Sequence, residues 1–88
     1  MFPVIFEDEA MDFVRKAERK HTGIYVPSAN GETVFYYRSM FNYDGIYCTE
    51  WTKKAEFGYC GMSSAQMAKI IYRECNKYGK MPILGHRK

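Results

Sequence analysis

Two stretches with helical periodicity flank a central segment dense in aromatic residues, and this arrangement restricts the fold more than any other feature. Ten of the fifteen Phe, Tyr and Trp residues of the 88-residue chain fall between Tyr25 and Tyr59. Aromatic and β-branched residues are favoured in strands, so we expect the middle of the chain to form a sheet. A chain of this length has room for one core. The sequence therefore predicts a single α+β domain over residues 1–88, with the order α-β-β-β-α.

The two helices are predicted at residues 7–20 and 64–78. The first stretch begins with acids and ends with bases, which complements the helix dipole, and its apolar residues recur at helical period. We expect Gly23 to end this helix. Ahead of the second stretch, Ser63 and Gln66 have the spacing of a capping box, and Gly79 stands where a helix stop is expected.

Three strands are predicted between the helices, at residues 24–26, 32–41 and 46–52. Turn signals at Asn30-Gly31 and Asp44-Gly45 separate them, which indicates a three-stranded antiparallel meander. We allow one more short strand, either at the N-terminus or near residues 56–59. The basic residues 80–88 are predicted to be an extended tail.

Alternation along the strands assigns six large aromatic residues to one face of the sheet. They are Tyr25, Phe35, Tyr37, Phe41, Tyr47 and Trp51. If both helices cover the other face, these residues form an exposed platform suited to a protein hot spot, to base stacking or to a ligand. The alternative is that the aromatic face is itself the core, with the helices packed on it.

The C-terminal quarter is strongly basic. From Met62 to the end there are six Lys and Arg residues against one acid, within a chain of net charge +3. Four cations recur at spacings of four, four and three on one side of the second helix and just beyond it, namely Lys69, Arg73, Lys77 and Lys80. Such a row could follow a phosphate backbone, and the simpler reading is an ordinary solvated helix face.

The three cysteines are an odd number without C-x-x-C spacing, which favours reduced thiols in a cytoplasmic setting over a disulfide framework. Cys60 precedes a predicted helix start, where the dipole could activate a thiol, with His21 or His86 as the base. The alternative is an inert loop thiol. A zinc site formed by the three cysteines and His21 is a weaker hypothesis, because the ligands lack paired spacing. We expect no metal and no cofactor.

The order α-β-β-β-α, with Gly61 and Ser63 leading into a helix that carries Ala68-Lys69, resembles the double-stranded-RNA-binding domain in outline. That family places a lysine pair at the start of its second helix, where this chain has Ser64 and Ala65. The resemblance therefore implies a fold and no function.

The leading functional hypothesis is a small non-enzymatic protein that binds a partner protein and regulates or inhibits it. Phage and mobile-element genes often encode such domains, so an inhibitor of a host defence complex is one form of this hypothesis. Nucleic-acid binding by the basic helix face is the first alternative, and a thiol enzyme using Cys60 is the second. No segment resembles a membrane anchor, and a homodimer stays open.

Overall fold

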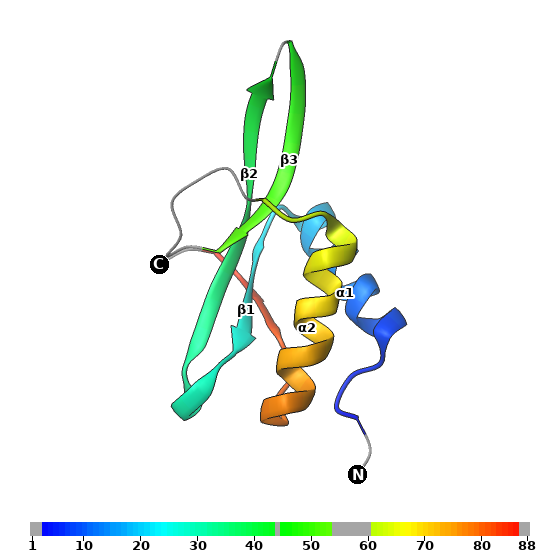
Figure 1. Cartoon of the computed structure of the whole chain (residues 1–88), viewed down its shortest axis with the longest axis vertical. Helices are drawn as coiled ribbons and strands as arrows, with labels where there is room; N and C mark the ends of the chain where they lie inside the picture. The colour runs from blue at the N-terminus through cyan, green and yellow to red at the C-terminus, as the bar shows by residue number, and fades with distance from the viewer. Residues whose placement is uncertain (1–2, 44, 54–60, 87–88) are drawn as a thin grey trace.

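Two helices lie side by side against one face of a four-stranded antiparallel sheet (Figure 1). The computed structural model describes residues 3–43, 45–53 and 61–86, and of residues 40–43 and 46–49 it describes the backbone alone. The elements are α1 (Glu7–Lys20), β1 (Gly23–Pro27), a 3₁₀ turn η1 (Ala29–Gly31), β2 (Thr33–Tyr43), β3 (Ile46–Lys53), α2 (Ser64–Tyr78) and β4 (Ile83–Gly85). The predicted α+β fold and its element order are confirmed.

The strands are arranged in the order β3-β2-β1-β4, and every neighbouring pair is antiparallel. The fourth strand comes from the predicted tail, where Leu84 lies opposite Ile24 of β1. The sequence predicts the extra strand at a different place, either at the N-terminus or near residues 56–59. The N-terminal residues 3–6 are outside any strand, and residues 56–59 lie outside the described part of the chain.

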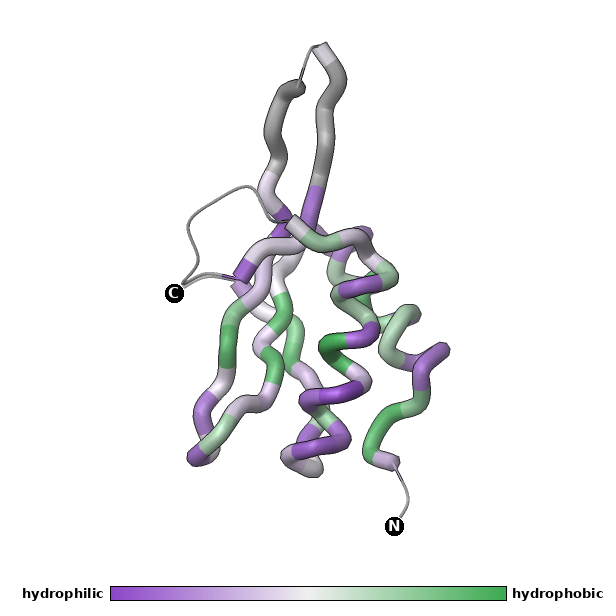
Figure 2. The backbone as a smooth tube through the Cα atoms, viewed as in Figure 1, coloured by the Kyte–Doolittle hydropathy of each residue, from purple (hydrophilic) through white to green (hydrophobic). Residues whose placement is uncertain are grey.

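The core fills the layer between the sheet and the helices. Its sheet side is built from Ile24, Val26, Tyr36 and Trp51, all 8% exposed or less. Its helix side is built from Ala10, Val14 and Ala17 of α1 and Met67, Ala68, Ile71 and Cys75 of α2. Figure 2 shows hydrophobic and hydrophilic residues interleaved along both helices, as expected when one side of each helix faces the core.

The helix ends follow local chemistry. The Ser63 hydroxyl accepts from the Gln66 amide at 3.2 Å, and the Gln66 side chain accepts from the Ser63 amide at 2.9 Å, which confirms the predicted capping box. Gly79 closes α2 with a φ of 67°. α1 ends at Lys20 as predicted, but its cap differs from the prediction, because His21 takes the left-handed conformation (φ 55°) and Gly23 becomes the first residue of β1.

Asn76 of α2 holds the segment that precedes α1. Its side-chain oxygen accepts from the amides of Val4 and Ile5 at 2.6 and 3.2 Å, and its side-chain nitrogen donates to the Ile5 carbonyl at 3.0 Å. Ile5 is 1% exposed. The Asn76 side chain thus supplies hydrogen-bond partners for backbone groups of residues 4–5, which are not in a strand and so have no partner strand.

The β2–β3 hairpin is longer than the rest of the sheet. β1 pairs with residues 33–36 of β2, and from residue 37 on β2 pairs with β3 alone. Figure 1 shows this hairpin projecting beyond both helices. The principal dimensions of 48 × 26 × 21 Å reflect that projection.

Candidate binding face of the sheet

Three of the six predicted platform residues lie together on the face opposite the helices. Tyr25 pairs with Phe35 across β1 and β2, and their ring centroids are 4.7 Å apart. Phe35 and Tyr37 are two residues apart on β2, with centroids 6.1 Å apart and planes inclined by 19°. All three side chains are half-buried. No element among the described residues covers this side, which we call the open face.

Glycines let these rings lie along the sheet. The ring of Phe35 occupies the space that a Cβ of Gly23 would need, and the ring of Tyr25 lies 2.8 Å from a Cβ built on Gly85. The Tyr25 hydroxyl also donates to the His86 carbonyl at 3.0 Å, which extends its ring across the edge strand β4. Aromatic rings that cover glycines on a neighbouring strand are a known stabilising pairing in sheets. The result is a shallow aromatic surface.

Trp51 is not part of this surface, and its predicted place on the aromatic face is wrong. Its side chain is 1% exposed and lies in the core. The reason is the register of the hairpin. Only two residues separate Tyr43 from Ile46, so odd positions of β2 face even positions of β3, and Trp51 lies opposite Arg38. The side chains of Phe41 and Tyr47 lie outside what the structure describes.

The same register brings polar side chains onto the open face. Thr52 lies opposite Tyr37, and Glu50 lies opposite Ser39. The hydroxyls of Ser39 and Thr52 are 3.1 Å apart. The sequence analysis missed these three residues, although counting across a two-residue turn would have paired them with the aromatic positions.

A shallow pocket of about 410 Å³ lies at the β4 end of the open face. It is lined by Tyr25, Thr33, Ile83, Leu84, Gly85 and His86. Ile83 lies opposite Tyr25 in the sheet and is 61% exposed. An exposed isoleucine beside an aromatic cluster is apolar surface that a partner can cover.

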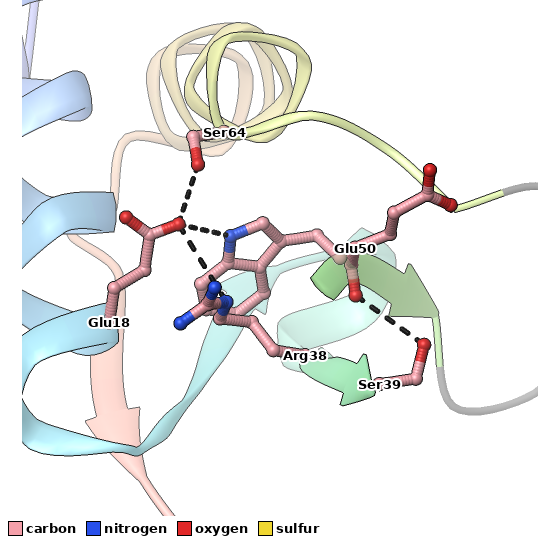
Figure 3. A network of polar contacts seen from close by, with 6 residues as sticks. Glu18, Arg38, Ser39, Glu50 and Ser64 are labelled. Atoms are coloured by element: carbon pink, nitrogen blue, oxygen red, sulfur yellow. Dashed lines mark hydrogen bonds and ion pairs between the residues drawn. The ribbon is translucent and has the colours of Figure 1, made fainter. Parts of the chain in front are cut away.

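A polar network on the opposite face fixes the sheet to both helices (Figure 3). One carboxylate oxygen of Glu18 accepts from Trp51 Nε1 at 3.2 Å and from the Ser64 hydroxyl at 2.5 Å, and it lies 3.8 Å from Arg38 Nε. Glu18 thereby joins α1 to β3, α2 and β2. Its contacts are those of a residue that stabilises the packing of the helices on the sheet.

The predicted basic row is exposed along α2 and beyond its end. Lys69, Arg73, Lys77 and Lys80 are all exposed. Arg73 forms an ion pair with Glu74 at 3.1 Å, and Lys77 lies 5.4 Å from the centre of the Tyr78 ring. Two of the four cations therefore already have partners within the chain.

The thiol hypotheses find no assembled site in the described part of the chain. Cys60 lies outside the described residues, so its role stays a prediction. Cys75 is fully buried, and burial, with a smaller contribution from Glu74, raises its thiol pKa to about 11. His21 follows α1 at the end where Glu18 contacts Ser64, and Cys75 lies eleven residues beyond Ser64, roughly 16 Å along α2. His21 and Cys75 therefore do not converge on one metal.

A scan against protein-family models, a search of curated proteins and a search of solved structures each gave no match. The likeness to the double-stranded-RNA-binding domain thus rests on element order. Neither α1 nor α2 is long and apolar enough to cross a membrane, and this holds for the described residues as a whole.

Proposed function

We propose that this chain is a small binding protein that engages a partner protein through the open face of its sheet and regulates or inhibits that partner by occupying its surface. The observation that carries the proposal is the contiguous ring cluster of Tyr25, Phe35 and Tyr37, flanked by exposed Ile83. Tyr-rich surfaces with an apolar neighbour are typical of protein hot spots.

The charge on this face supports a protein over a nucleic acid. Among its described residues there is no Lys or Arg, and Glu50 supplies a carboxylate. Surfaces that stack nucleobases combine aromatic rings with cations that contact the phosphates. The open face has the aromatic rings but, among its described residues, lacks the cations.

The test is affinity capture from nuclease-treated extract with quantitative mass spectrometry. We expect one or a few proteins to be retained by the wild-type chain and lost with Tyr37→Ser or Ile83→Ser, two changes at opposite ends of the open face. The matched control, Lys69→Glu/Arg73→Glu/Lys77→Glu, alters the outer side of α2 and should retain them. Proteins lost only with the control variant would contradict the proposal.

Nucleic-acid binding by α2 is the second candidate, favoured by the exposure of Lys69, Arg73 and Lys77 on successive turns. It predicts binding to labelled DNA or RNA that weakens steeply between about 50 and 200 mM salt. Fluorescence anisotropy with the same triple variant measures this. Binding that persists in the variant, or no binding at the lower salt, would exclude this use of the helix.

A further inference from the structure

A groove of about 450 Å³ runs along the side of α1 that faces away from α2, and we call it the α1 groove. It is lined by Ile5, Glu9, Asp12, Phe13, Lys16, Arg19 and Met81. The five helix residues in this set are spaced by three, one, three and three, so they form one stripe at helical period. Glu7 and Met11, on the other side of the helix, lie beside α2.

Three of the residues that line the α1 groove are apolar. Ile5 is buried, Phe13 is half-buried and Met81 is 48% exposed. Phe6, the N-cap of α1 and the neighbour of Ile5 in the chain, is exposed as well. Among the described residues only Phe6, Met81 and Ile83 are large, apolar and exposed. Exposed apolar surface with charges around it is typical of a contact site.

The charges along the α1 groove are ordered. Glu9 and Asp12 lie toward the start of α1, Lys16 and Arg19 lie toward its end, and all four are exposed. Along the helix axis, Asp12 and Lys16 lie about 3 Å to either side of Val14. Glu9 and Arg19 lie about 7.5 Å to either side of it. Within the described part of the chain, Asp12, Lys16 and Arg19 form no ion pair.

We propose that the α1 groove is the interface of a symmetric homodimer, in which α1 packs antiparallel against α1 of a second copy of this chain. A two-fold axis at the level of Val14 reverses the helix. It sets Asp12 opposite Lys16 of the second copy, and Glu9 opposite Arg19. A two-fold interface must be self-complementary, and this order of charges is complementary to itself only when the helices are antiparallel. Phe13 and Met81 are then covered by the second copy.

The mixed charge of the groove favours a second copy over other occupants. A nucleic acid would meet the carboxylates of Glu9 and Asp12, and a protein surface of a single charge sign would match only half of the groove. The open face lies on the other side of the sheet, so the dimer leaves it free and does not depend on the proposed function. Because α1 is about 21 Å long, the contact is small and we expect weak association.

The experiment is sedimentation equilibrium of the full chain from about 20 µM to 1 mM, a range suited to a small interface. We expect a monomer–dimer equilibrium that weakens as salt rises from about 50 to 500 mM, because the ion pairs are exposed. Asp12→Lys and Lys16→Glu each set like charges opposite one another twice in the dimer. Each should raise the dissociation constant about tenfold or more. Glu9 is left unchanged, because its carboxylate caps α1 by accepting from the Phe6 amide.

Mixing the two variants tests the pairing itself. In a heterodimer of the Asp12→Lys and Lys16→Glu chains every charge again lies opposite its counterpart, so an equimolar mixture should associate about as tightly as wild type. The matched control is Arg15→Glu, which changes the net charge as Lys16→Glu does at an exposed position of α1 outside the groove. It should change the dissociation constant by less than about twofold. Far-UV circular dichroism verifies the fold of all three.

Several results would overturn the inference: a chain that stays monomeric throughout the range, a dimer that survives both charge reversals, or a mixture that does not restore association. If the chain is monomeric and a captured protein is lost with Lys16→Glu, the groove binds another protein and the homodimer is wrong. Ile83→Ser, on the open face, should dimerise like wild type. Loss of the dimer in that variant would place the interface on the open face and refute the assignment to α1.

Discussion

Removing the Glu18 carboxylate should destabilise the domain far more than an exposed glutamate would. In Glu18→Ala the Trp51 indole N–H, buried with the ring at 1% exposure, loses its acceptor. An orphaned buried donor costs about 1–3 kcal/mol. Loss of the ion pair with Arg38, whose atoms are 3.8 Å apart and partly exposed, adds about 0–1 kcal/mol. The Ser64 hydroxyl is half-exposed and can turn to water.

The expected loss is therefore about 1–4 kcal/mol of the unfolding free energy, and a loss of about 2–3 kcal/mol, in the middle of that range, lowers Tm by about 8–24 °C for a domain of this size. The assay is urea unfolding followed by the fluorescence of Trp51, the single tryptophan. Glu18→Gln is the matched control, because its amide oxygen can still accept from the indole, so it should lose less than about 1 kcal/mol.

A double-mutant cycle with Trp51→Phe isolates the hydrogen bond. Because phenylalanine carries no N–H, Glu18→Ala should cost about 1–2 kcal/mol less in that background, measured by circular dichroism. Equal losses for Glu18→Ala and Glu18→Gln, or a coupling below about 0.5 kcal/mol, would refute the reasoning.

Three further predictions concern single residues. Asn76→Ala should lower stability by about 2 kcal/mol, because Ile5 loses two hydrogen bonds, and hydrogen exchange should show lost protection at Ile5; unchanged exchange there would count against it. Gly23→Ala should destabilise by about 1–3 kcal/mol in thermal unfolding, since its Cβ would collide with the Phe35 ring and lie 2.7 Å from a backbone carbonyl, and a neutral result would show that the ring moves aside freely. Because the folded pKa of Cys75, about 11, exceeds the ordinary thiol pKa of 9.0, its contribution to stability is complete below pH 9 and declines toward pH 11. Wild type should thus lose more stability than Cys75→Ala over that range, and parallel pH profiles would contradict the assignment.

The elements that depend on local chemistry were predictable from the sequence. The bounds of α1 and α2, the Ser63 capping box and the Gly79 stop were all predicted, because each follows from residues within one or two turns. The residue that caps the end of α1 was not, since His21, and not Gly23, takes the left-handed conformation that glycine usually supplies.

The prediction of which side chains share a face of the sheet was wrong at one step, the register between β2 and β3, which could have been counted from the length of the turn. The prediction treated odd positions of all three central strands as sharing a face, which holds between β1 and β2, where Tyr25 meets Phe35. It fails across a two-residue turn, which pairs odd with even positions and turns Trp51 into the core. By contrast, no sequence pattern indicated that Glu18, 33 residues away, would accept the indole N–H, because that contact depends on helix packing.

The projecting hairpin also limits how its length can change. Removing or adding one residue in each strand leaves Arg38 opposite Trp51, so the core and the open face keep their side chains. Removing a single residue would move every later position of β3 to the other side and expel Trp51 from the core. Natural or engineered variants of this chain should therefore lengthen or shorten the hairpin by even numbers of residues. A peptide inserted at its tip in such steps would be carried clear of the helices.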